Sequence, residues 1–337
     1  MKRFLWLFIP ILLVCLLCHM NYDTIIRKNM LDEYIAELRL SASGSKDIYK
    51  QRMVNLLSDM HEYAHEKNSN FNVIINGGYG LYNPSINKVK ASRDKLMKSV
   101  EATLIEDIYY GCDTTLNKAT PKSERKKMKE SVKFARNSGI PVFNIEYCTK
   151  KKAESAKKNS KELGTVCYTA PSVELDKIPV RKGNTKDRKS INKITNFLIV
   201  LNPDKYKDKK SYLSALKNTD YDMIIIDAYF NDKLLTKKDV DSLRKKKNGK
   251  KRLVCSYISV GEAEDYRYYF KSSWKKNPPK WMKKENKSWK GNYKVKYWDN
   301  EWKKILYKGK DSYLDKLLGA GFDGAYFDVI DAYEYFE

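Results

Sequence analysis

The stretch Arg252-Leu-Val-Cys-Ser-Tyr-Ile-Ser-Val-Gly-Glu-Ala-Glu264 decides the fold. Its first seven residues are mostly the apolar, β-branched and aromatic types that strands favour, and two carboxylates follow them closely. Similar runs recur along the chain, separated by helical patterns, at residues 71–76, 102–108, 141–147, 165–168, 197–201, 222–227, 293–298 and 325–328. Short strands alternating with helices predict βα units around a parallel sheet, and nine candidates are one more than an eight-stranded barrel needs.

Polar and mostly acidic side chains stand at the C-terminal tips of these predicted strands. They are Asn76, Glu106, Asp107, Glu146, Asp227, Glu262, Glu264, Asp299, Asp328 and Asp331. A single acidic tip is adequately explained as a helix cap, but in an α/β barrel all the tips converge on one mouth, where active sites lie. Carboxylates with few histidines suit two chemistries: glycosidic hydrolysis by a carboxylate pair, or binding of a divalent cation by oxygen ligands.

Aromatic residues favour the first of these chemistries. Five of the six tryptophans fall between Trp274 and Trp302. Sugar rings stack their apolar faces on aromatic side chains, so Tyr257, Tyr297 and Trp298 are candidates for binding a glycan. At least two rings of this stretch are expected to pack helices onto the barrel instead. Aromatic residues among basic ones also suit single-stranded nucleic acid, but an export signal argues against that partner.

The composition of the chain is strongly basic, and it contains few cysteines and histidines. The chain has 66 Lys and Arg against 42 Asp and Glu, a net charge of +24. Such a balance attracts anionic partners, although lysine is spread through every segment instead of forming one stripe. The four cysteines beyond the first 20 residues are far apart, which indicates free, buried thiols. The chain has three histidines in all, so a metal site built from histidines is not expected. We also expect no cofactor and a monomeric protein.

The N-terminus predicts export. Met1-Lys-Arg3 is a short basic region, and an apolar run of about 15 residues from Phe4 to Cys18 follows. The run is shorter than the roughly 20 residues that cross a bilayer, and no clean cleavage site follows it. Residues 1–20 are therefore interpreted as a signal peptide or a membrane anchor, and the protein as extracytoplasmic, either secreted or anchored.

Three blocks in the second half of the chain resemble one family. Ser256-Tyr-Ile-Ser-Val-Gly-Glu-Ala-Glu-Asp-Tyr-Arg267 resembles the main motif of the glycoside hydrolase family 114 type barrels, the endo-α-1,4-polygalactosaminidase-like proteins. The stretches 289–299 and 321–334 are similar to the next two family blocks, in the family's order. The resemblance implies a (β/α)8 TIM barrel.

The remaining strands of such a barrel are found at the front of the chain. Residues 53–82, 104–111 and 142–148 are similar to the family's later elements, and the segment 178–196 has the polar composition of a linker. We therefore expect a circular permutation. Residues 21–177 supply the later strands and 197–337 the earlier ones, in a single catalytic domain behind the N-terminal segment.

The resemblance also implies the site. Asp328 and Glu106 would form the carboxylate pair, with Asp328 as nucleophile and Glu106 as general acid/base. Glu262, Glu264, Asp227, Asp331, Glu146 and Asn76 would orient the sugar. The implied substrate is an α-1,4-linked, galactosamine-rich polysaccharide. A neutral or anionic cell-surface glycan, a non-catalytic glycan-binding barrel, and binding to an anionic surface stay open as alternatives.

Overall fold

The computed structural model describes residue 35 and residues 46–179 and 185–337. The chain divides into two compact units, and the barrel lies within the second, residues 52–337. The predicted signal or anchor at residues 1–20 lies outside the described residues. Among the residues that are described, no helix is both long and apolar enough to span a bilayer.

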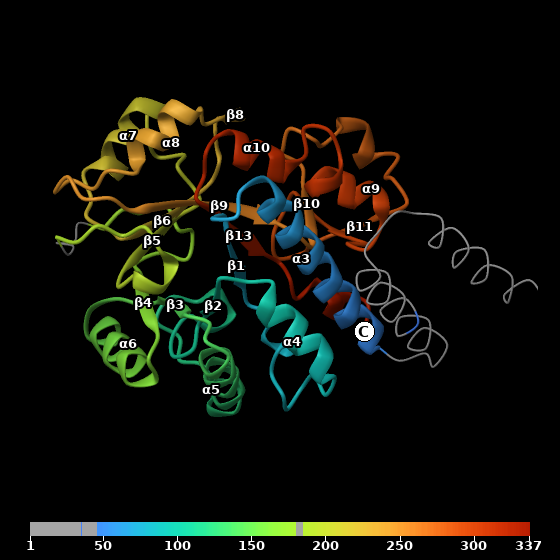
Figure 1. Ribbon diagram of the computed structural model, residues 1–337, viewed down its shortest axis with the longest axis horizontal. Coiled ribbons are helices and arrows are strands. Elements are labelled where there is room, and N and C mark those ends of the chain that lie inside the picture. The colour runs from blue at the N-terminus through green and yellow to red at the C-terminus, as the bar shows by residue number, and fades with distance from the viewer. Residues whose placement is uncertain (1–34, 36–45, 180–184) are drawn as a thin grey trace, which may run out of the picture. The chain divides into compact units, whose positions relative to one another are not determined.

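Eight parallel strands form the barrel, as the sequence predicts (Figure 1). In chain order they are β1 (Asn72–Asn76), β2 (Ala102–Glu106), β3 (Val142–Tyr147), β4 (Val166–Ala170), β5 (Phe197–Val200), β6 (Met223–Ile226), β9 (Leu253–Ser259) and β13 (Gly324–Asp328). Their hydrogen-bonded order is β4-β3-β2-β1-β13-β9-β6-β5. Most of these strands are buried along their whole length, which fits the continuous apolar runs of a parallel sheet that is covered on both faces.

The barrel closes between β4 and β5, the two ends of this hydrogen-bonded order. The ring of Phe197 on β5 packs against Tyr168 on β4 and Phe143 on β3, with ring centroids 5.8 and 5.3 Å apart. Beyond the strands, the amide of Leu201 donates to the carbonyl of Leu175 (3.0 Å). Side-chain packing and loop contacts therefore complete a nearly closed (β/α)8 TIM barrel.

The first and last strands of the chain are neighbours. β1 pairs with β13 in register, with Asn72 opposite Gly324 and Ile75 opposite Phe327. A Cβ on Gly324 would lie 2.4 Å from the carbonyl oxygen of Asn72. Only glycine therefore lets β13 approach β1 this closely.

Helices alternate with the strands. They are α3 (Asp47–Lys67), α4 (Lys90–Lys98), α5 (Lys122–Asn137), α6 (Lys150–Leu163), α7 (Lys209–Lys217), α8 (Lys237–Leu243), α9 (Asn300–Lys303) and α10 (Tyr313–Gly319). On α3, Met53, Val54, Leu57 and Met60 are fully buried and form the apolar face of the helix. Tyr63 of the same helix donates to Asp315 of α10 (2.9 Å), so α3 packs beside the helix that leads into β13.

The ninth predicted strand lies outside the barrel. β12 (Asn292–Val295) pairs antiparallel with β10 (Glu262–Glu264) and β11 (Met282–Glu285) in a separate three-stranded sheet. This sheet follows β9 and brings the tryptophan-rich segment to the C-terminal end of the barrel. A two-stranded hairpin, β7 (Tyr229–Phe230) and β8 (Lys233–Leu234), follows β6 at the same end.

A buried ion pair fixes the described part of the predicted 178–196 linker. Lys246 and Asp222 have fully buried side chains 2.6 Å apart. Lys246 also donates to the carbonyl of Lys186 (3.0 Å), and Asp222 accepts from Arg188 and Thr195. This part of the segment is thus tied to the N-terminal end of β6. The four cysteines of the described chain are free thiols, as predicted; Cys148 and Cys255 are buried, whereas Cys112 and Cys167 are only partly buried.

Replacing Lys246 with methionine is expected to lower the free energy of unfolding by about 3–5 kcal/mol, because Asp222 would lose its principal counter-charge in a buried site. Chemical denaturation followed by circular dichroism measures the loss. The exposed neighbour Lys247→Met is the matched control and should change stability by less than about 0.5 kcal/mol. Equal stability of the two variants would contradict this role of the ion pair.

Candidate active site

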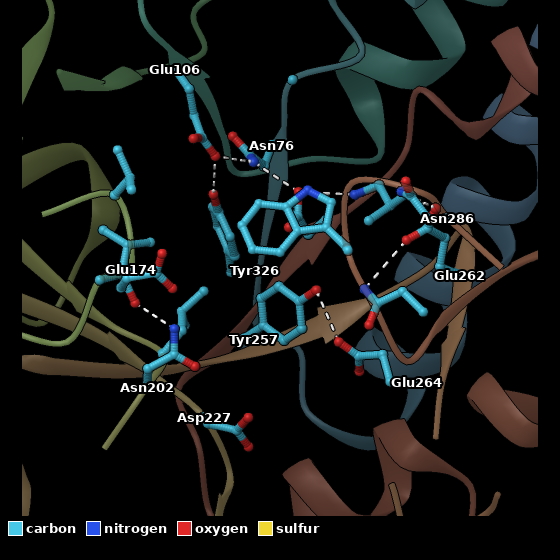
Figure 2. Close-up of a pocket in the computed structure, with 18 of the residues that line it drawn as sticks. Asn76, Glu106, Glu174, Asn202, Asp227, Tyr257, Glu262, Glu264, Asn286 and Tyr326 are labelled. Atoms are coloured by element: carbon cyan, nitrogen blue, oxygen red, sulfur yellow. Dashed lines mark hydrogen bonds between the residues drawn. The ribbon is translucent and has the colours of Figure 1, made fainter. Parts of the chain in front are cut away.

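A cavity of about 1000 Å³ lies at the C-terminal ends of the strands. Its wall combines strand tips, the loops that follow them and the three-stranded sheet (Figure 2). Of the residues that the sequence predicts for the site, eight line this cavity: Asn76, Glu106, Asp227, Tyr257, Glu262, Glu264, Asp328 and Asp331. The prediction of a mouth built from strand ends is therefore matched by the position of most of its residues.

Asn76 bridges the two candidate carboxylates. Its Nδ2 donates to Oε1 of Glu106 (2.6 Å) and to Oδ1 of Asp328 (2.8 Å). Because both bonds start at the same nitrogen, the distance from Oε1 of Glu106 to Oδ1 of Asp328 cannot exceed the sum of the two bond lengths. This keeps them within the roughly 5–5.5 Å of a retaining glycosidase pair, and below the roughly 6.5–9.5 Å of an inverting pair.

The two carboxylates have different surroundings. Besides Asn76, Glu106 accepts from the hydroxyls of Tyr147 (2.6 Å) and Tyr326 (3.3 Å). Within the described residues, the carboxylate of Asp328 accepts one further bond, from the amide of Val329 (2.9 Å). Burial, followed by the charge of Glu106, raises the pKa of Asp328 to about 7. Asp328 therefore holds a proton more readily than an ordinary aspartate when the cavity is empty.

Each of these carboxylates is followed by a residue in the left-handed backbone region. Asp107 has φ 58° and Val329 has φ 57°. For a β-branched residue such as valine this conformation is a true outlier, and strain of this kind gathers at functional sites. The turn at Val329 aims its amide at Oδ1 of Asp328, so the strained backbone fixes the orientation of the carboxylate.

Asp107, one of the acidic residues at the predicted strand tips, also lines the cavity. Burial, together with the charges of Glu106 and Glu146, raises its pKa to about 8. Its buried Oδ1 finds no hydrogen-bond partner among the described residues. A neutral Asp107 beside Glu106 offers a proton-bearing group to a ligand in the cavity.

Two of the predicted carboxylates form ion pairs with the same arginine. The buried Arg267 donates to both oxygens of Asp227 (2.9 and 2.8 Å) and through Nε to Glu264 (2.6 Å). Glu264 also accepts from Tyr257 (3.2 Å) and Tyr266 (2.6 Å). Asp227 and Glu264 therefore form an ion-paired wall of the cavity, and Arg267 and Tyr266 are site residues that the strand-tip criterion missed.

Glu262 and Asp331 lie on the side formed by the three-stranded sheet. Glu262 accepts from Asn286 (2.8 Å), Asn292 (3.3 Å) and Tyr335 (2.8 Å). Burial and nearby carboxylates raise the pKa of Asp331 to about 6. The amides around Glu262 come from the loop after β11 and from β12, so the additional sheet supplies polar groups for ligand recognition.

Glu146 does not line the cavity, in contrast to its predicted place in the site. It is completely buried, and its carboxylate accepts from the backbone amides of Tyr109 (2.9 Å) and Tyr110 (2.7 Å) and from Asn144 (2.8 Å). Successive strand residues face opposite sides, so the next residue, Tyr147, is the one that reaches the cavity. Glu146 instead holds the loop that follows Glu106.

Tyr297 and Trp298 also lie away from the cavity wall. Tyr297 is fully buried, and Trp298 packs edge-on against Phe336 with ring centroids 4.7 Å apart. Their predicted stacking on sugar is therefore replaced by packing inside the protein. Trp289 is the tryptophan that lines the cavity, and it is 48% exposed. Trp289 lies after β11, on a loop of the three-stranded sheet. The number of tryptophans in this segment could not predict which of them lines the cavity.

The cavity carboxylates do not converge on one point. Glu106, Glu262 and Asp328 accept from amides or tyrosines, and Asp227 and Glu264 pair with Arg267. In the described residues the cluster that brings metal-ligating atoms together lies elsewhere in the protein. The cavity thus combines three features that are typical of glycoside hydrolase sites. They are a close carboxylate pair, an adjacent aromatic surface and many hydrogen-bonding groups.

Comparison with known proteins points to one family. Residues 177–337 match the model of Glycoside-hydrolase family GH114, so this segment is similar to that family. The match covers β5, β6, β9 and β13 and contains Asp328, whereas Glu106 and Asn76 lie before it.

Three relatives are uncharacterized proteins. One from Methanocaldococcus jannaschii is 42% identical over 134 residues, which cover 39% of this chain and 36% of the relative. One from Thermotoga maritima is 51% identical over 80 residues, 24% of each chain. One from Deinococcus radiodurans is 34% identical over 122 residues, 36% of this chain and 37% of the relative. The chain thus spans about a third or less of the length of these relatives.

Trp289→Ala is expected to raise KM for a glycan about 2- to 10-fold with little change in kcat, because one stacking surface is lost. Steady-state kinetics on a galactosamine-rich polymer measures the effect. Trp298→Ala, assayed per amount of folded protein, is the control and should leave KM unchanged. A larger KM effect of Trp298→Ala than of Trp289→Ala would contradict the assignment of the stacking residue.

Proposed function

We propose that this protein is a retaining, endo-acting glycoside hydrolase that cleaves a galactosamine-rich polysaccharide. The bridge from Asn76 to both Glu106 and Asp328 carries the proposal, because it keeps one oxygen of each carboxylate within the short separation that suits a retaining pair better than an inverting one. The match of residues 177–337 to a glycoside hydrolase family supports the same chemistry.

In the proposed reaction Asp328 attacks the anomeric carbon while the bond to the leaving oxygen breaks, and Glu106 gives that oxygen its proton. A water molecule then attacks the glycosyl ester. Glu106 takes the proton of the water, and Asp328 leaves as a carboxylate. Asp328 must be ionised to attack, so its raised pKa in the empty cavity implies that the substrate helps to remove its proton.

A cationic sugar would promote the ionisation of Asp328. Acidic residues in the cavity outnumber the two basic ones, Arg267 and Lys290, five to one: Glu106, Asp107, Glu174, Asp204, Asp227, Asp232, Glu262, Glu264, Asp328 and Asp331. The remainder of the protein carries the large positive charge, which is screened beyond about 8–10 Å. An ammonium group in the cavity favours the ionised form of nearby carboxylates. This local acidity favours an amino sugar over an anionic glycan.

The permuted order of the two halves remains our proposal as well. The barrel closes without ladder pairing between β4 and β5, where the family's first and last strands would meet in unpermuted order. The family match begins at residue 177, just before β5. Helix α3, which precedes β1, packs against α10 in the position between β13 and β1. We further propose, from residues 1–20, an extracytoplasmic location.

Asp328→Asn and Glu106→Gln are each expected to lower kcat by at least about 1000-fold, with the fold retained, because each removes one member of the pair. Reducing-end release from partly deacetylated polygalactosamine measures the loss. Glu154→Gln, an exposed position on α6 outside the cavity, is the matched control. Full activity in either pair variant would contradict the assignment. Binding without turnover by the wild type, across polymers including neutral and anionic glycans, would favour the glycan-binding alternative.

Asn76→Ala is expected to move the acid limb of the pH profile of kcat/KM to higher pH. The hydrogen bond from Asn76 lowers the pKa of Asp328, so its loss raises that pKa, and the nucleophile then ionises only at higher pH. Asn286→Ala, which removes a bond to Glu262 instead, is the control and should leave this limb in place. If the alkaline limb moves upward instead, Asp328 is the proton donor and the two roles are reversed.

A further inference from the structure

Two of the three histidines of the chain meet a glutamate outside the cavity. His61 and His65 are four residues apart on α3 and therefore share one helical face. Glu101 directly precedes β2, and Phe71, which contacts His65, directly precedes β1. The cluster thus lies at the N-terminal end of the barrel strands, opposite the end that forms the cavity.

The side chains converge on one oxygen. Nε2 of His61 lies 3.1 Å and Nε2 of His65 lies 3.4 Å from the same Oε1 of Glu101. One ligand atom from each of the three residues lies within 4.8 Å of the others. Atoms that share a tetrahedral zinc ion at bond lengths of about 2.0–2.1 Å are roughly 3.3 Å apart. The spacing in this cluster already approaches that of a metal site.

Neighbouring backbone groups orient the ligands. Oε2 of Glu101 accepts from the amide of Val73 (2.7 Å), which leaves Oε1 for the imidazoles. Nε2 of His65 lies 2.8 Å from the carbonyl of Phe71, so in the metal-free protein this nitrogen carries a proton that a metal would replace. Metal binding would break the bond to Phe71, whereas the bond from Val73 would remain and orient the carboxylate; contacts of this second kind commonly raise the affinity of a site for its metal.

The cluster is accessible to an ion from solvent. The side chains of His61, His65 and Glu101 are 15%, 27% and 26% exposed. Their partial burial reduces the competition from bulk water, whereas their remaining exposure leaves an entry path. Two imidazole nitrogens and one carboxylate oxygen suit zinc and similar transition metals better than calcium or magnesium, which prefer oxygen ligands alone.

We propose that His61, His65 and Glu101 bind a divalent transition metal ion of the zinc class, with water completing the coordination. The ion links α3 to the segments that begin β1 and β2. It therefore stabilises the barrel at the end opposite the cavity and takes no part in the proposed hydrolysis. The small number of histidines predicted no such site. The spacing of four residues between His61 and His65, which places two side chains on one face of a helix, is nevertheless visible in the sequence.

The test uses the whole chain, purified without a histidine tag and treated with a chelator. Cobalt(II) is expected to give visible absorption bands of a four- or five-coordinate site at one equivalent. Zinc is expected to displace it and to raise Tm. His61→Ala, His65→Ala and Glu101→Gln should each weaken zinc binding at least tenfold by calorimetry. Glu66→Gln, an exposed position on α3, is the matched control and should bind as the wild type does.

Because a substitution in α3 could impair folding, the wild type alone also provides a decisive measurement. Copper(II) electron paramagnetic resonance should show nitrogen hyperfine structure from coordinated imidazole. Absence of cobalt bands in the folded wild type, or unchanged zinc affinity in the three variants, would overturn the proposal. The cluster would then be a hydrogen-bonded contact only. Glycan hydrolysis is not a readout here, so failure of the metal site and failure of the proposed function are distinguished.

Discussion

The side chain of Asn76 is the contact on which the site depends. Its amide can bond to both Glu106 and Asp328 only because β1 lies between β2 and β13, so that three strand tips from distant parts of the chain meet. Glu106 and Asp328 are about 220 positions apart in sequence, and only the pairing of β1 with β13 brings them together. The geometry of the candidate pair is therefore a direct consequence of the pairing of β1 with β2 and β13.

The surroundings of this contact divide into two kinds of polar group. Tyr147, Tyr326 and the strained turn at Val329 fix the candidate pair. Across the cavity, Arg267 neutralises Asp227 and Glu264, and amides from the three-stranded sheet hold Glu262. The acidic mouth is thus partly a rigid ion-paired wall and partly a set of carboxylates without a cationic partner in the cavity. The second set underlies the proposed preference of the cavity for a cationic sugar.

Much of the fold could be predicted from the sequence, since fully buried parallel strands appear as continuous apolar runs and their tips as acidic residues. The site was predicted less completely. The tip position of Glu146 says nothing about the side to which its side chain points, and strand alternation directs it away from the cavity. Tyr297 and Trp298 were chosen from aromatic density, but packing against Phe336 decides their place. The Arg267 network and Trp289 depend on the three-stranded sheet, whose pairing is non-local.

The stereochemistry of hydrolysis tests the central claim most directly. Proton nuclear magnetic resonance of the freshly formed reducing end, during cleavage of an α-1,4-linked galactosamine oligomer, distinguishes the two anomers before mutarotation. A carboxylate pair held together by Asn76 predicts that the α-anomer appears first, through a covalent intermediate on Asp328. Initial release of the β-anomer would contradict the account, because it requires a water molecule between carboxylates that stand farther apart.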